Sequence, residues 1–122
     1  MSKIIHFMLD LQSNIKLYHW MTKSFPRHKA SDSLVEKMSE LGDKFIEVYI
    51  GKYGRPELHK KDNIIILHNF DDNSVIKYLD HCIVFLIKDL SKLLTKDDVD
   101  LLNLRDEMVA TLNQTKYLFT FS

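Results

Sequence analysis

Apolar residues recur every three or four positions through most of the chain, which is the spacing that keeps side chains on one face of an α-helix. Two such runs predict helices over residues 3–24 and 29–52, and two later runs predict helices over 73–94 and 96–117. Residues 53–72 lack this pattern and predict a crossover with a short ordered piece inside. With only 3 Gly and 2 Pro in 122 residues, the composition also favours helices.

The expected helix ends follow from residues that cap or break helices. Pro26 disfavours a helical conformation of Phe25, so the first helix is expected to end near Ser24. Thr95, followed three residues later by Asp98, is close to a capping box and predicts the start of the last helix.

Connection lengths predict how the helices are joined. Short links make the first and second helices one antiparallel hairpin and the third and fourth another, while about 20 residues of crossover suffice to run the length of a helix. We therefore expect an all-α fold, a single ferritin-like four-helix bundle over residues 1–122 made of two antiparallel hairpins joined by a long crossover.

The charge balance and the cysteine content indicate which kinds of partner and which cellular compartment to expect. Lys and Arg number 17 and Asp and Glu number 17, so the basic surface that holds nucleic-acid phosphates is not expected. Cys82, the one cysteine, lies in an apolar run and suits a reducing compartment. No apolar stretch approaches the ~20 residues of a membrane span, so a cytoplasmic protein without a membrane partner is expected.

A polar stripe on the second helix is the strongest candidate for chemistry. Steps of four, eleven and four residues, all close to whole helical turns, separate its members, which are His28, Asp32, Asp43 and Glu47. Metal ligands must converge to within ~2.2 Å of one ion, yet Asp32 and Asp43 are about 16 Å apart along the helix axis. One copy of this helix therefore cannot assemble a site.

Two antiparallel copies of the helix remove this difficulty. Residue numbers then pair with a constant sum, and both 28 with 47 and 32 with 43 add up to 75. The same two-fold axis therefore places His28 opposite Glu47 of a partner and Asp32 opposite Asp43. The pattern predicts a homodimer with two identical His-Asp-Asp-Glu clusters at its interface.

The first helix supplies a further candidate ligand. His19 precedes His28 by nine residues, and a tight helical hairpin is expected to bring the two imidazoles side by side. Mixed nitrogen and oxygen ligands suit Fe(II), Mn(II) or Zn(II), whereas Ca(II) takes oxygen ligands. Of these ions, iron is the candidate for redox chemistry at the site. The candidate metal-binding and catalytic residues are thus His19, His28, Asp32, Asp43 and Glu47.

These residues carry a resemblance to a known family. Over about residues 15–56 the chain resembles the Dps-type mini-ferritins, through His19-Trp20, Phe25, His28-x3-Asp32-x10-Asp43-x3-Glu47 and Gly54-Arg55-Pro56. The resemblance implies a ferritin-like subunit that oxidises Fe(II), preferentially with hydrogen peroxide, and stores Fe(III) in a shell of twelve subunits. It also implies ferroxidase ligands from His19, His28 and Asp32 of one subunit and Asp43 and Glu47 of its mate, with Trp20 near the iron.

The expected function is therefore an iron-binding ferroxidase that uses hydrogen peroxide or oxygen at a dimer interface, for iron storage, detoxification and protection against oxidative stress. The alternative is a non-enzymatic helical interaction protein that keeps the mini-ferritin dimer and has lost ferroxidase turnover. A di-iron centre inside one bundle is not expected, because the chain contains no Glu-x-x-His motif.

Overall fold

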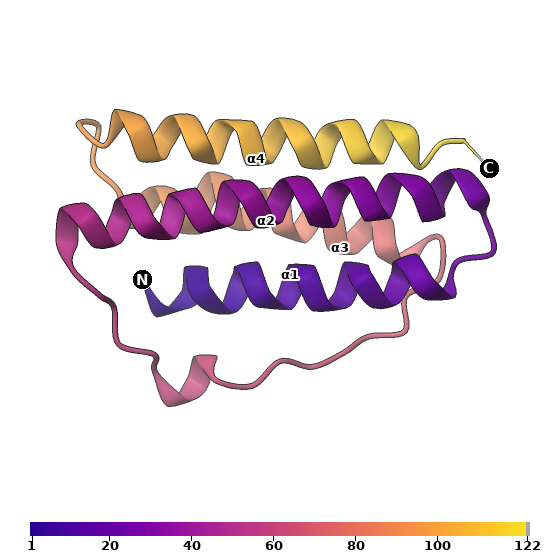
Figure 1. Ribbon diagram of the computed structural model, residues 1–122, viewed down its shortest axis with the longest axis horizontal. Coiled ribbons are helices and arrows are strands. Elements are labelled where there is room, and N and C mark those ends of the chain that lie inside the picture. The colour runs from indigo at the N-terminus through magenta and orange to yellow at the C-terminus, as the bar shows by residue number, and fades with distance from the viewer. Residues whose placement is uncertain (122) are drawn as a thin grey trace.

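The computed structural model describes residues 1–121, and these residues form four α-helices and no strand. Figure 1 shows the helices side by side in a small bundle, which confirms the all-α expectation. Their bounds are Ser2–Met21 for α1, Phe25–Tyr53 for α2, Ser74–Val84 for α3 and Val99–Leu118 for α4.

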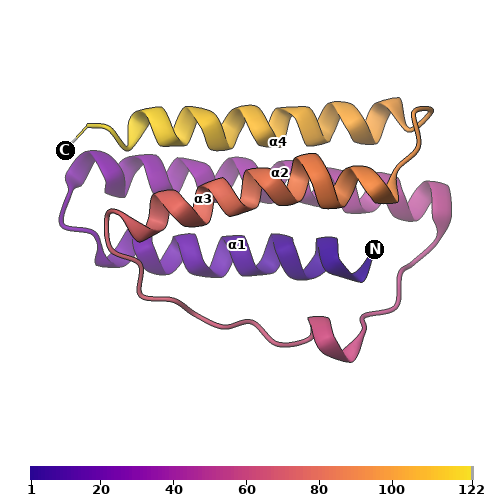
Figure 2. The ribbon, with the colours of Figure 1, turned by 180° about the vertical axis from the view of Figure 1, so that it is seen from behind.

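The connections alternate between short and long. A turn of three residues joins α1 to the antiparallel α2, and a short link joins α3 to the antiparallel α4. Between them, the crossover returns along the outside of α1 to the end of the bundle where α2 begins, and one 3₁₀ turn, Lys60–Asp62, interrupts it. Figure 2 shows the same path from behind. As a result α3 runs parallel to α2, and the described chain ends at the opposite end of the bundle from its start.

Helix α2 begins at Phe25, four residues earlier than its apolar pattern predicts. The prediction treated Pro26 only as a helix breaker. In the structure Pro26 lies in the first turn, where a missing N–H costs no helical hydrogen bond. Ser24 is the N-cap, and its Oγ accepts the Arg27 N–H at 3.3 Å.

The third and fourth helices also differ from the expected ranges. After Val84 the chain continues through a π-helical turn, Phe85–Asp89, and a 3₁₀ turn, Leu90–Leu93, instead of a regular α-helix. The last helix begins at Val99, after an N-cap at Asp98. Asp98 Oδ2 accepts the Thr95 N–H at 2.8 Å. The predicted capping pair of Thr95 and Asp98 is therefore hydrogen-bonded, but both residues precede the helix that they were expected to begin.

The core is formed by the apolar stripe of each helix. Its members recur every three or four residues and are almost completely buried; they include Leu11, Ile15, Met38, Phe45, Leu79, Leu86, Leu90, Leu101, Met108 and Leu112. Within residues 1–121, no helix combines the length and apolar character that crossing a bilayer requires.

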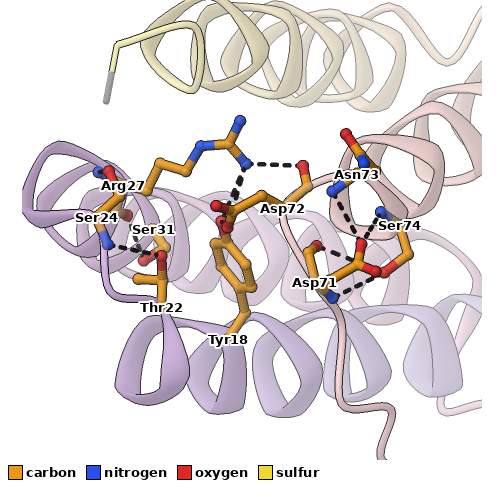
Figure 3. A network of polar contacts seen from close by, with 9 residues as sticks. All are labelled: Tyr18, Thr22, Ser24, Arg27, Ser31, Asp71, Asp72, Asn73 and Ser74. Carbon is orange, nitrogen blue, oxygen red and sulfur yellow. Dashed lines mark hydrogen bonds and ion pairs between the residues drawn. The ribbon is translucent and has the colours of Figure 1, made fainter.

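A polar network fastens the end of the crossover to the α1–α2 hairpin, as Figure 3 shows. Tyr18 Oη donates to Asp72 Oδ1 at 2.7 Å. Arg27 Nη1 donates to Tyr18 Oη at 3.0 Å and to the Asp72 carbonyl at 2.9 Å. These bonds hold α3 in place relative to the turn between α1 and α2.

The start of α3 is capped from within the same segment. Asp71 Oδ1 accepts the backbone N–H of Ser74 at 2.7 Å and that of Asn73 at 2.9 Å (Figure 3). The N–H of Ser74, followed by that of Asn73, holds the pKa of Asp71 below its ordinary value. An ionised Asp71 therefore fixes the point at which the crossover becomes helix.

Candidate metal centre

The short turn between α1 and α2 brings two histidines into contact. His19, in the last turn of α1, stacks on His28, in the first turns of α2, with ring centroids 4.0 Å apart and 16° between the planes. His19 is 8% exposed, and His28 is half-buried. The two imidazoles that the sequence expects side by side are therefore neighbours within one chain.

Each imidazole is oriented by the backbone of the other residue. His19 Nδ1 donates to the His28 carbonyl at 2.7 Å, and His28 Nδ1 donates to the His19 carbonyl at 2.8 Å. Because a carbonyl oxygen only accepts, each Nδ1 carries a hydrogen. In the neutral rings this leaves both Nε2 atoms without one, as lone pairs that are free to bind a metal.

The pair also has a structural role. The last carbonyls of a helix lack partners within that helix, and His28 satisfies one of them at the end of α1. Ser31, fully buried on α2, donates to the Arg27 carbonyl at 2.7 Å and contacts the His28 carbonyl at 3.1 Å. These bonds close the hairpin and fix the two rings.

Asp32 completes the group that one chain brings together. Its Oδ1 lies 3.9 Å from His19 Nε2 and 3.7 Å from Lys16 Nζ, and its side chain is 58% exposed. Within residues 1–121 no group of three or more His, Cys, Asp or Glu side chains has the geometry to hold a metal ion. His19, His28 and Asp32 are thus at most one part of a site.

The other two candidate ligands lie farther along α2. Asp43 and Glu47 are exposed, and the structure does not bring them to the histidine pair. A shallow depression of about 420 Å³ joins Asp32 to Asp43 along the helix surface. Its lining consists of Lys16, Asp32, Val35, Glu36, Ser39, Glu40 and Asp43.

This surface, which we call the acidic α2 face, is defined by the exposed carboxylates of Asp32, Glu36, Glu40, Asp43 and Glu47. Lys16 of α1 is the one basic residue that lines the depression. Lys37, on the same helix, contacts Gln114 of α4 instead. The face therefore has an excess of negative charge.

Trp20 follows His19 in α1 and lies outside the core. It is 65% exposed, and Lys16 Nζ lies 5.8 Å from the centroid of its ring. Lys16 and Ser31 were not among the site residues predicted from the sequence. Each lies one helical turn from a candidate histidine, three residues before His19 or three after His28, and this spacing is the signal that would have identified them.

Comparisons with known proteins give a family but no activity. The model of a family described as "Family of unknown function (DUF5856)" matches residues 19–119. A protein of Enterobacteria phage T4, described as an uncharacterized 14.6 kDa protein in the mobD-ri intergenic region, is 35% identical over 94 residues, covering 69% of this chain and 73% of the relative. No solved structure gives a significant match to the chain.

The assignment to the Dps-type mini-ferritins is wrong, because the family model that matches most of the chain belongs to a different family. The signature consisted largely of steps of four and eleven residues, and any polar stripe on a helix produces steps near whole turns. Such spacing shows that residues share one face of a helix, and it says little about whether two proteins are homologous. Iron storage, a twelve-subunit shell and the role given to Trp20 rested on that resemblance and lose its support.

Proposed function

The chain belongs to the DUF5856 family, whose function is unknown, and we propose from its own geometry that it binds a divalent transition-metal ion between two copies and, when the ion is Fe(II), oxidises it. The proposed ligands are His19, His28 and Asp32 of one copy with Asp43 and Glu47 of the other. Zn(II) or Mn(II) would bind the same ligands.

The histidine pair is the observation that carries this proposal. Metal-binding histidines in proteins almost always donate the other ring N–H to a carbonyl or carboxylate, which fixes the tautomer and the ring orientation. His19 and His28 both have this arrangement. Asp32 adds a carboxylate, with Oδ1 3.9 Å from His19 Nε2.

The acidic α2 face supplies the reason for a second copy. Residues of α2 that line its depression form pairs whose numbers add up to 75, namely 32 with 43, 35 with 40 and 36 with 39. An antiparallel α2–α2 contact centred on this depression therefore sets Asp43 of one copy opposite Asp32 of the other. By the same symmetry Glu47 lies opposite His28, which completes two equivalent sites.

Electrostatics make this contact dependent on cations. Bringing two acidic α2 faces together places carboxylates against carboxylates, and like charges in contact repel. A divalent cation in each cluster offsets this repulsion. We therefore propose that the α2–α2 dimer forms with bound metal and separates without it.

Fe(II) bound there has the groups that its oxidation requires. Carboxylates stabilise the higher charge of Fe(III), and the fixed imidazoles hold the coordination geometry. Two Fe(II) ions give two electrons to one hydrogen peroxide, which with two protons becomes two waters; molecular oxygen is the alternative oxidant. The ion is the substrate in this reaction.

The helix order supports a finer description of the fold. Two antiparallel hairpins joined by a connection along the length of the bundle are the arrangement of ferritin-like bundles with one long crossover. We propose this as a description of architecture, separate from family membership.

A second candidate is a non-enzymatic interaction protein. The observation in its favour is that the histidine pair already serves the structure, because its reciprocal bonds close the α1–α2 hairpin. In this case the rings bind no ion, and the protein acts through its surfaces.

Removing one carboxylate tests the catalytic proposal. Asp43→Asn keeps the shape and the exposure of the side chain but removes its charge, and we expect peroxide-driven Fe(II) oxidation to fall by about 10- to 100-fold while helicity is unchanged. Asp97→Asn, a matched change at an exposed residue outside the acidic α2 face, is the control. Stopped-flow absorbance of Fe(III) measures the rate, and equal rates in the two variants would contradict the site.

A further inference from the structure

The crossover has an extended segment with one free edge. Residues 63–70 run beside α1, on the outside of the bundle, in both Figure 1 and Figure 2. Three bonds fasten them to α1. His6 Nε2 donates to the Ile64 carbonyl at 2.8 Å, and Asn14 joins two positions, with Nδ2 donating to the Ile66 carbonyl at 3.1 Å and Oδ1 accepting the His68 N–H at 2.7 Å.

The bonded positions are all even-numbered. In extended backbone the N–H and C=O of successive residues point to opposite edges, so residues 64, 66 and 68 face α1. Ile65 and Leu67 then direct their N–H and C=O groups away from the bundle. Among the hydrogen bonds of residues 1–121, none uses these four groups.

The free edge is apolar as well as unpaired. Ile64, Ile66 and Leu67 are 67%, 63% and 60% exposed, and β-branched residues favour extended structure. An exposed apolar strand edge is a template for pairing with another strand. Charges of opposite sign flank it, with Lys60 and Lys61 before it and Asp71 and Asp72 after it.

We propose that this edge pairs antiparallel with the same edge of a second copy, about a two-fold axis at Ile66. Opposed residue numbers then add up to 132. Ile65 is set opposite Leu67 of the other copy, so the outward N–H and C=O groups of both strands meet as hydrogen-bonded pairs. Ile66 faces its own copy across the axis.

The free backbone groups select this register. With the axis at Ile66, Ile65 and Leu67 pair with each other, whereas an axis at Ile65 would set Leu67 opposite Asn63, whose φ of −95° and ψ of 2° are not extended. The flanking charges favour the antiparallel direction, because the 3₁₀ turn that carries Lys60 and Lys61 then lies at the same end as Asp71 of the other copy.

This contact is separate from the acidic α2 face. In both views α1 lies between the crossover and α2, so the two contacts use different elements of the molecule. Pairing through the crossover uses neutral backbone and complementary charges, and it needs no metal. It therefore persists in EDTA, where the proposed α2–α2 dimer does not form.

Cysteine cross-linking in EDTA tests the register. Ile66→Cys places two thiols directly across the axis, about 4.5 Å apart at Cα, which a disulfide spans with little adjustment. Ile64→Cys is the matched control: its side chain is equally exposed and lies on the same face of the strand as that of Ile66, but its two copies are offset by four residues, about 14 Å. Wild type is the blank, because Cys82 is buried.

We expect Ile66→Cys to oxidise to a covalent dimer at least about tenfold faster than Ile64→Cys, since thiols beyond ~7 Å at Cα do not bridge without backbone movement. Equal rates, or no dimer from either variant, would overturn the proposal.

Lys61→Glu provides a second measurement, in a chain without the added cysteine. Sedimentation equilibrium should show at least about tenfold weaker self-association, and unchanged association would also count against the pairing.

Discussion

At the scale of single residues, the tautomers of His19 and His28 decide what the hairpin is able to bind. Each Nδ1 is committed to a carbonyl, so each Nε2 is the remaining ligand atom. A histidine pair with the opposite tautomers would bury its lone pairs against carbonyl oxygens, which repel them. The metal proposal therefore depends on two protons whose positions follow from the backbone.

Nitrogen NMR of the imidazoles checks these protons directly. In metal-free protein at pH 8 we expect His19 and His28 both to carry their hydrogen on Nδ1, and Zn(II) to shift the two Nε2 resonances in particular. His81, exposed on α3, serves as the internal reference. Hydrogen on Nε2 of either paired ring would contradict the orientation described here.

At the scale of elements, Asp98 joins the end of α2 to the start of α4. Lys52 Nζ lies 2.7 Å from Asp98 Oδ1, the Thr95 N–H donates to Oδ2 at 2.8 Å, and Tyr53 Oη donates to the same carboxylate. Lys52 chiefly, then the Thr95 N–H and Tyr53, hold the pKa of Asp98 well below its ordinary value. The ionised carboxylate thus stabilises the folded junction.

This shift gives stability a defined dependence on pH. Since the pKa of Asp98 is lower in the folded chain than the ~3.9 of an unfolded one, its contribution is complete above about pH 4 and is lost as the pH falls toward the folded pKa. We expect Asp98→Asn to lower the urea midpoint at pH 7 and to reduce its fall between pH 5 and 2. Asp97→Asn is the control, and identical acid profiles for wild type and Asp98→Asn would refute this role.

The four helices show how much of the fold could be predicted from the sequence. Apolar spacing identifies all four helices because their core stripes are regular. Apolar spacing misplaces the ends of a helix where the same residue type either stops or starts a helix, or where the same apolar pattern fits two kinds of helix. Pro26 stops a helix in mid-run but starts one in its first turn, and the π-helical turn at Phe85–Asp89 follows apolar residues that also fit a regular helix.

At the scale of the whole molecule, the site separates into a part that sequence predicts and a part that needs a partner. The nine-residue step through a tight hairpin was enough to predict that His19 meets His28, because both lie at the same end of that hairpin. Ser31 and Lys16 were missed although each lies three residues from a candidate histidine, because that spacing suggests a neighbour but does not give its contacts. Asp43 and Glu47 would join the histidines only through a second copy, and whole-turn spacing on one helix does not show that a second copy binds there.

Two different two-fold contacts would give the protein two modes of assembly. In our proposals the acidic α2 face pairs when metal is bound, and the crossover edge pairs without metal. Copies that use both contacts form assemblies larger than a dimer, which are closed if the two axes meet at suitable angles and extended otherwise. Metal would then control assembly size as well as site occupancy.

Anaerobic calorimetric titration with Fe(II) of wild type, His28→Ala and Asp43→Asn measures whether both copies contribute ligands to one ion. We expect one ion per chain in wild type and at least about tenfold weaker binding in both variants, because His28 comes from one copy and Asp43 from the other. Absence of Fe(II) binding by wild type, or an affinity that Asp43→Asn leaves unchanged, would contradict a metal site shared between two α2 helices.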